Sequence, residues 1–400
     1  MSLSGDALKS LAFQASLSPK EEMLEIGQKN QSLYIGIPKE TELQEQRVAL
    51  VPESVGFLVA NGHRVVVESG AGQKANFSDS DYSESGAEII HDTKEVYKAD
   101  IILKVSPPNI KEISLMQHRQ ILFSALQLTV QPKDALEKLM SKKITAIAWD
   151  YIEDENGSFP LIRSMGEIAG TTSFLIAAEL MSNANNGKGL MLGGVAGISP
   201  PELVIIGAGT VGQFAASAAL ALGVSVKVFD NSLYKLRRLQ KEIGHKVFTS
   251  VIQPKVLEKA LKRCDVAIGA ISAPGGRTPC IVSEDIVKKM KSGSVIVDVS
   301  IDKGGCFETS KPTTHRDPTY EVDNIIHYCV KNIPSAVPFS ATNALNEATK
   351  PFILKFANSG LHGLFNDNKL LMALNTFKGK LTNHEVAEAH SLSFTSPESV

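Results

Sequence analysis

A glycine-rich turn carries the clearest chemical signal in the chain. It follows an apolar, β-branched run at residues 202–206 and opens an alanine-rich helical segment. In such a strand–turn–helix unit the first glycine makes a tight turn, the second lets the backbone approach a pyrophosphate, and the third lets helix and sheet pack closely. The helix N-terminus adds unpaired N–H groups and a positive dipole end. We therefore expect a dinucleotide to contact Gly207, Gly209, Thr210, Val211 and Gly212.

An acidic residue stands where the next predicted strand ends. Asp230 lies 18 residues beyond Gly212, about where a carboxylate hydrogen-bonds the adenosine ribose of a dinucleotide. Its charge would repel a 2′-phosphate, so the sequence favours NAD over NADP as the cofactor. Lys235 is a further predicted cofactor contact. Because Lys235 and the Arg237–Arg238 pair follow Asp230 closely, the preference for NAD is not absolute.

The elements that would position these groups form two series of predicted strands. Short apolar runs place the first series at residues 33–37, 63–68 and 99–105, and the second at 202–206, 224–230, 265–269 and 294–299. Helical patterns, such as residues 53–61, fill the gaps. Alternation of short strands with helices is typical of βαβ units and a parallel sheet.

Two long helical stretches accompany these series. Residues 164–186, with the glycine-rich loop 187–201, are interpreted as an interdomain helix and an entry into the second sheet. Residues 343–358 contain Pro351, which predicts a kink. If this later helix returns to the first domain, that domain is discontinuous.

We therefore predict an α/β protein with two doubly wound Rossmann-like domains joined by long helices, the substrate domain being discontinuous. The predicted units are an N-terminal extension (1–32), a substrate or catalytic domain (33–160 and 336–400) and an NAD-binding Rossmann domain (161–335).

Composition narrows the class of protein without naming a function. Among 400 residues, 41 lysines and arginines face 43 aspartates and glutamates, so the net charge is −2 and a nucleic-acid partner is not expected. No uncharged apolar run reaches the length of a membrane helix, so no membrane partner is expected either. The four cysteines form no C-x-x-C pair, which indicates neither a disulfide framework nor a metal site and fits the cytoplasm.

Several segments together resemble one known family. The residues that carry the resemblance are Ile35–Pro52 (IGIPKETELQEQRVALVP), Gly187–Gly197 (GKGLMLGGVAG), the GAGTVG turn, Val297–Glu308 (VDVSIDKGGCFE), Thr309–Thr314 (TSKPTT) and the stretch 328–338. They are similar to the alanine dehydrogenase and pyridine nucleotide transhydrogenase α-subunit family, over nearly all of residues 33–400. IDKGGCFE and KPTT are closer to alanine dehydrogenase.

The resemblance implies where a small 2-amino or 2-oxo acid would bind. Arg47 in EQRVAL and Lys104 in ILKV match the family residues that bind the substrate carboxylate and carbonyl. A guanidinium can grip a carboxylate with two parallel hydrogen bonds, and lysine supplies a second positive charge. Taken alone, each residue would be read as a solvated surface charge.

The resemblance also implies a catalytic acid–base and a nicotinamide pocket. Asp302 in SIDKGG matches the catalytic aspartate, and Asn332 in KNIP matches an asparagine of the nicotinamide-side loop. Asp298 faces the same side of the chain as Asp302 and could be mistaken for the catalytic aspartate. The cofactor contacts predicted on this side are Ile271, Ser272, Val299, Ile301, Asp302, Lys311, Asn332 and Ile333.

Three positions depart from the family pattern. Alanine dehydrogenases of the family carry a catalytic histidine where this chain has Gln127, and glutamine cannot carry a proton at neutral pH. Gly166 replaces a serine, which removes a hydroxyl near the cofactor. Lys311 replaces an arginine, which keeps the charge and loses the planar fork. The predicted catalytic residues are Asp302, Lys104 and Gln127, with Asp302 as the acid–base and Gln127 orienting the substrate carbonyl or water.

The leading hypothesis is NAD-dependent oxidative deamination of L-alanine to pyruvate and ammonia, and the reverse reductive amination. Gln127 keeps two alternatives open: a stand-alone transhydrogenase-α-like subunit that passes hydride to a partner protein, and a catalytically impaired NAD-binding regulatory protein. Saccharopine-dehydrogenase-like chemistry would share Arg47 and Lys104 but also expects the histidine. The family resemblance implies a homo-oligomer.

Overall fold

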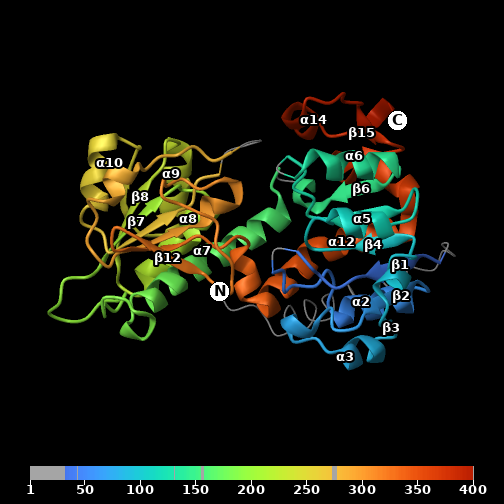
Figure 1. Ribbon diagram of the computed structural model, residues 1–400, viewed down its shortest axis with the longest axis horizontal. Coiled ribbons are helices and arrows are strands. Elements are labelled where there is room, and N and C mark those ends of the chain that lie inside the picture. Colours follow the sequence, from blue (N-terminus) through green and yellow to red (C-terminus); the bar gives the residue numbers. More distant parts are fainter. Residues whose placement is uncertain (1–31, 43, 130, 155–156, 273–276, 400) are drawn as a thin grey trace, which may run out of the picture.

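The computed structural model describes residues 32–42, 44–129, 131–154, 157–272 and 277–399. The predicted extension, apart from residue 32, lies outside the described residues. Figure 1 shows two lobes, each built on a sheet, with helices α7 (Pro160–Leu180) and α12 (Pro338–Phe365) running between them. The α/β class and the two wound sheets are confirmed.

The first sheet has the strand order β15-β14-β6-β5-β4-β1-β2-β3. Its strands are β1 (Tyr34–Ile37), β2 (Arg64–Glu68), β3 (Glu88–Ile90), β4 (Ile101–Leu103), β5 (Ile121–Ser124), β6 (Thr145–Ala148), β14 (Leu374–Phe377) and β15 (Lys380–Leu381). The first six are parallel, whereas β14 pairs antiparallel with β6 and β15. Since the carboxyl ends of parallel strands meet at one edge, the segments that follow β1, β4, β5 and β6 lie together there.

The second sheet has the order β12-β13-β11-β10-β7-β8-β9. Its strands are β7 (Glu202–Ile206), β8 (Ser225–Phe229), β9 (Phe248–Ser250), β10 (Val266–Gly269), β11 (Val295–Asp298), β12 (Thr319–Val322) and β13 (Ile325–Tyr328). Only the β12–β13 pair is antiparallel. Strand order reverses between β7 and β10, and nucleotides bind at such a switch point.

The remaining helices connect and cover the two sheets. Their bounds are α2 (Pro52–Ala60), α3 (Asp79–Glu84), α4 (Thr93–Val96), α5 (Ile110–Leu115), α6 (Lys133–Ser141), α8 (Thr210–Ala221), α9 (Leu233–Ile243), α10 (Pro254–Leu261), α11 (Glu284–Val287), α13 (Asn368–Met372) and α14 (His384–His390). The 3₁₀ turns at the site are η2 (Trp149–Tyr151), η4 (Val299–Lys303) and η5 (Ile333–Ala336). None of the helices in the described ranges is long and apolar enough to cross a membrane.

The chain returns to the first sheet through α12. Thr342 and Asn346 of this helix accept the backbone N–H groups of Val48 and Val51 at 3.2 and 3.3 Å, next to Arg47. Strands β14 and β15 then extend the sheet beyond β6. We expected a kink at Pro351, but the non-helical φ and ψ inside α12 occur at Gly360, whose φ is +60°. The domain boundaries at residues 160–161 and 335–336 stay a prediction.

Candidate active site between the two sheets

The glycine turn is tightly packed against the protein backbone at two of its glycines and open at the third. A Cβ on Gly207 would lie 2.3 Å from the carbonyl oxygen of Ala270, and one on Gly212 would lie 1.9 Å from that of Gly207. Gly209 differs, because nothing lies within 4 Å of its Cβ position. Gly209 also caps α8 without a side-chain hydrogen bond, so the helix N–H groups are left for phosphate oxygens. The turn therefore fits NAD.

Asp230 joins the glycine turn to the end of β8. Its carboxylate accepts the backbone N–H groups of Ala208 at 2.8 Å and Ser232 at 2.7 Å. Asp230, which is predicted to bind the adenosine ribose, is thus held beside the glycine turn. Lys235 lies in the first turn of α9, where its backbone N–H donates to the Ser232 hydroxyl. Their contacts with the cofactor stay predictions.

The ends of β10 and β11 form the predicted nicotinamide side. The Ile271 N–H donates to the hydroxyl of Ser300 at 2.9 Å, which links the two strand ends. Ile301 and Ile333 are buried beside this edge. The other predicted contacts, Ser272, Val299 and Lys311, remain at least partly accessible to solvent. Lys311 contributes a backbone N–H to the Tyr320 hydroxyl at 2.6 Å.

Asp298 and Asp302 have different surroundings. Asp298 is fully buried and accepts N–H bonds from Ser300 and Cys306 and a hydroxyl bond from Ser310. It therefore holds the η4 turn together. Asp302 lies in that turn with an exposed side chain, which accepts the backbone N–H of Asn332 at 3.1 Å. Desolvation by the surrounding protein raises the pKa of the Asp302 carboxyl, although the Asn332 N–H and the charges of Lys331 and Arg47 oppose the shift.

Arg47 is held in a buried ion pair. Its Nε and Nη2 donate to the two carboxylate oxygens of Glu45 at 2.7 and 2.6 Å, and Nη2 also donates to the Asn332 side-chain oxygen at 2.9 Å. Nη1 faces the sulfur of Met165 at 3.0 Å. Burial alone would raise the pKa of Glu45, but the charge and hydrogen bonds of Arg47 outweigh it and lower that pKa to about 2. Arg47 and Glu45 are therefore both ionised.

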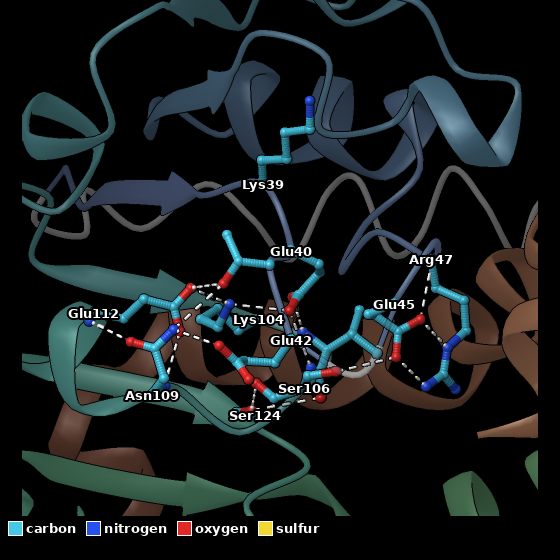
Figure 2. A network of polar contacts seen from close by, with 12 residues as sticks. Lys39, Glu40, Glu42, Glu45, Arg47, Lys104, Ser106, Asn109, Glu112 and Ser124 are labelled. Atoms are coloured by element: carbon cyan, nitrogen blue, oxygen red, sulfur yellow. Dashed lines mark hydrogen bonds and ion pairs between the residues drawn. The ribbon is translucent and has the colours of Figure 1, made fainter. Parts of the chain in front are cut away.

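Lys104 is buried between two carboxylates at the end of β4, as Figure 2 shows. Its Nζ donates to Glu40 at 2.9 Å and Glu112 at 3.1 Å, and the other Glu40 oxygen accepts the Val105 N–H at 2.6 Å. Burial favours the neutral amine, but both carboxylates oppose it and raise the pKa of Lys104. Burial also raises the pKa of Glu40, and the charge of Glu45 adds to this rise, although Lys104 opposes it. Lys104 is therefore a fixed positive charge.

Local sequence explains why Glu112 reaches Lys104. Asn109 and Glu112 form a capping box at the start of α5, each side chain accepting the other's backbone N–H at 2.9 Å. One Glu112 oxygen serves this cap, while the other accepts Lys104 and the Thr41 hydroxyl. The N-x-x-E spacing is a signal that could have identified Glu112 from sequence. Glu40 and Glu45, which the sequence reasoning also missed, carry no comparable local signal.

Gln127 lies at the same sheet edge, just beyond β5. Its side chain is exposed, and its backbone is left-handed with φ of +45°. Asp150 in η2 accepts the backbone N–H groups of Leu126 at 3.1 Å and Gln127 at 3.4 Å. Asp150 was not predicted from sequence. Gly166 lies on α7 opposite Thr210, where a Cβ would come within 3.3 Å of the threonine methyl group.

The structure thus brings the predicted residues together from both sheets. Arg47, Lys104 and Gln127 follow β1, β4 and β5 at one edge, and Asp302 and Asn332 follow β11 and β13. Asn332 joins the two groups, because its N–H bonds Asp302 while its side chain bonds Arg47 and Glu45. Within the ranges the structure describes, no cluster of histidine, cysteine, aspartate and glutamate could hold a metal ion.

Comparisons with known proteins agree with this arrangement. Family models described as "Alanine dehydrogenase/PNT, N-terminal domain" and "Alanine dehydrogenase/PNT, C-terminal domain" match residues 36–169 and 173–384. Alanine dehydrogenase 2 of Staphylococcus aureus strain USA300 is 41% identical over 368 residues, which cover 92% of this chain and 99% of the relative.

Two solved structures extend the comparison. An L-alanine dehydrogenase superposes with a TM-score of 0.84 at 41% identity, covering 89% of this chain and 99% of that chain. A transhydrogenase from Sinorhizobium meliloti shares the fold, with a TM-score of 0.74 at 22% identity and coverage of 88% and 99%. The resemblance drawn from the sequence motifs is confirmed: the chain belongs to the alanine dehydrogenase/PNT family.

Proposed function

We propose that this chain is an alanine dehydrogenase, which oxidises L-alanine to pyruvate and ammonia with NAD and catalyses the reverse reductive amination. NAD is the cofactor of the family, and the glycine turn fits it. The observation that carries the proposal is the link from Arg47 through Asn332 to Asp302, with Lys104 at the same sheet edge as Arg47. Two cations at one sheet edge and a carboxyl group linked to one of them would suit the carboxylate and amine of a small amino acid.

The donor geometry supports carboxylate binding by Arg47 and Lys104. Glu45 and Asn332 accept the hydrogen bonds of Nε and Nη2 of Arg47, whereas the one partner of Nη1 among the described residues is a thioether, which is a weak acceptor. An ammonium has three donors, and Glu40 and Glu112 take two of those on Lys104. Each cation therefore keeps a donor for the substrate carboxylate or carbonyl.

The chemical roles follow from the protonation states. Bound NAD would accept a hydride from the substrate α-carbon. Asp302, whose pKa is raised by desolvation, would take a proton from the substrate amine. Lys104 stays protonated and would polarise the carbonyl in the reverse direction. Gln127 would orient the carbonyl or a water by hydrogen bonding.

The test is an assay of the purified chain. NADH formation at 340 nm is followed with NAD⁺ and a panel of L-amino acids, and NADH consumption with pyruvate and ammonium. We expect alanine turnover that falls by about 10²–10⁴-fold in Asp302→Asn. Tight NADH binding without turnover of any amino acid would refute the proposal.

Gln127 supports a second candidate, a transhydrogenase-α-like subunit that hands hydride to a partner protein, because this side chain cannot exchange protons. That function predicts NADH binding and hydride exchange only when the partner is added. A regulatory NAD-binding protein with impaired catalysis predicts neither reaction. The amino-acid assay separates both from the first proposal.

A homo-oligomer is also proposed. Four large apolar side chains are exposed in the nucleotide domain: Met191, Val195, Ile198 and Leu222. The hydrogen bond from the Gly194 N–H to the Leu222 carbonyl joins the two segments that carry them. Solvent-exposed apolar patches are typical of subunit interfaces. Light scattering on the purified chain tests this proposal.

A cytoplasmic location is likewise proposed, supported by the four free cysteines.

A further inference from the structure

A carboxyl group beside Gln127 has no role in the mechanism proposed above. Strands β5 and β6 are parallel neighbours, and Ser124 pairs with Ala148 at their carboxyl ends. The chain leaves β6 directly into η2, which contains Asp150. The two Asp150 carboxylate oxygens accept the N–H groups of Leu126 and Gln127. Asp150 therefore lies at the sheet edge that also carries Lys104 and Arg47.

Rigid packing fixes the position of Asp150. The preceding residue, Trp149, is 1% exposed, and its ring centroid lies 6.1 Å from that of Phe123 in β5. Phe356 of α12 packs edge-on against Phe123, with ring centroids 5.0 Å apart. The carboxyl ends of β5 and β6, from which Gln127 and Asp150 follow, are thus held by one aromatic cluster. A group held this way is preorganised for chemistry.

Asp150 also differs from the other carboxylates at this edge in its partners. Glu40, Glu45 and Glu112 are each paired with Lys104 or Arg47. Among the described residues Asp150 forms no ion pair, and its hydrogen bonds come from backbone N–H groups. Burial raises the pKa of Asp150 to about 6, although the N–H bonds oppose this shift. Its carboxyl can therefore exchange protons near neutral pH.

Charged and titratable groups surround Asp150 on several elements. Lys303 acts on it from η4 of the other sheet, one residue after Asp302. On its own turn it neighbours Tyr151, whose hydroxyl donates to Glu385 of α14 at 3.3 Å. From the same helix, His390 bonds the Leu128 carbonyl at 2.6 Å, beside Gln127. Asp150 therefore lies within electrostatic reach of the η4 turn that carries Asp302.

We propose that Asp150 is the acid–base for the hydrolytic half of the reaction, in place of Gln127, which cannot carry a proton. This inference rests on the proposed alanine dehydrogenase activity. After hydride has left the α-carbon, water attacks the iminium carbon, forming a C–O bond, and one water proton passes to Asp150. Asp150 then returns this proton to the amine nitrogen, the C–N bond breaks, and the hydroxyl proton leaves with ammonia as ammonium while the carbonyl forms.

The test separates hydride transfer from hydrolysis. Asp150→Asn keeps the size of the side chain and removes its proton exchange. When this variant is mixed rapidly with NAD⁺ and L-alanine, we expect one equivalent of NADH per active site at the wild-type rate. Steady-state turnover should then be slower by about 10²–10⁴-fold. The acidic limb of the wild-type kcat profile near pH 6 should be absent in the variant.

A matched variant and a binding measurement control for misfolding. Asp134→Asn makes the same change at an exposed position of α6 in the same domain and should behave as wild type. NADH binding, followed by fluorescence, should be equal in all three proteins. Asp150→Glu, which retains a carboxyl group, should recover part of the turnover and the acidic limb.

Each contrary result has a distinct meaning. Unchanged turnover and an unchanged acidic limb in Asp150→Asn would overturn the inference. Loss of the rapid NADH phase together with turnover would overturn it too, because Asp150 would then act before hydrolysis or only hold the Gln127 turn. If wild-type protein itself makes no NADH from alanine, the proposed function fails, and that failure is seen before any variant is compared.

Discussion

The side-chain oxygen of Asn332 accepts a hydrogen bond from Nη2 of Arg47 at 2.9 Å, across 285 residues of sequence. The same Asn332 amide donates to Glu45 at 2.7 Å, and its backbone N–H donates to Asp302 at 3.1 Å. One residue in the segment that follows β13 thus contacts both the candidate substrate-binding arginine and the candidate acid–base. The separation of Arg47 and Asp302 is set by this link.

Removing the Asn332 side chain should weaken substrate binding. Asn332 has a left-handed backbone with φ of +62°, so Asn332→Gly removes the side chain without backbone strain, whereas Asn332→Ala adds strain. Hydrogen bonds to charged groups contribute about 1.5–3 kcal/mol, so we expect KM for alanine to rise by about 10–100-fold in both variants. Thermal unfolding should show an added loss of stability only in the Asn332→Ala variant. Unchanged KM in Asn332→Gly would contradict the proposed link.

The glycine turn predicts two different outcomes for the same substitution. Gly209→Ala places a methyl group in open space, so the protein should fold with an unchanged Tm while NADH binds at least about 10-fold more weakly. Gly212→Ala places the methyl group against the Gly207 carbonyl, so Tm should fall as well. Fluorescence titration and calorimetry measure the two effects. Normal NADH affinity in Gly209→Ala would show that the cofactor does not approach this residue.

The Glu45–Arg47 pair predicts a stability difference that depends on pH. The pKa of Glu45 is lowered to about 2, so its stabilising effect is complete above the ordinary glutamate pKa and is lost as pH falls toward 2. Glu45→Gln should therefore reduce the free energy of unfolding by about 3 kcal/mol at pH 7, since it leaves Arg47 buried without a counter-charge. Urea unfolding should show the deficit shrinking below about pH 4.5. A deficit independent of pH would contradict the ion pair as its source.

Removal of Lys104 should cause a loss of unfolding free energy that grows as pH rises over the range from 5 to 8. Lys104→Met leaves Glu40 and Glu112 buried beside each other without their cation, which raises the pKa of Glu40 further. A carboxyl whose folded pKa is raised contributes stability at low pH and loses it as pH rises. We expect a loss of about 3–5 kcal/mol at pH 8 and a smaller loss at pH 5. The control variant Lys133→Met, at an exposed position, should lose little stability at either pH.

How far the sequence could predict this site depends on how local each signal is. The GAGTVG turn, its strand and its helix lie within about twenty residues, so the glycine turn could be predicted from the sequence. Asp230 could be predicted from its spacing after Gly212. Asp302 could be separated from Asp298 only by resemblance, because burial of Asp298 is a tertiary fact. Glu40 meets Lys104 across 64 residues and Glu45 meets Asn332 across 287, and no periodic pattern records such pairs.

Asp150 illustrates the same limit and gives the last prediction. Its pKa of about 6 arises from burial in a turn between β6 and α7 whose neighbours come from β5 and η4. Because the folded pKa lies above that of an unfolded aspartate, this group stabilises the fold fully below about pH 4 and loses the contribution as pH rises through 6. Wild-type protein, without cofactor or substrate, should therefore lose about 2 kcal/mol of unfolding free energy relative to Asp150→Asn between pH 4.5 and pH 7.5. Urea titrations at the two pH values measure the difference, and Asp134→Asn should track wild type at both. If wild type and Asp150→Asn change in parallel, Asp150 keeps an ordinary pKa and cannot exchange protons near neutrality.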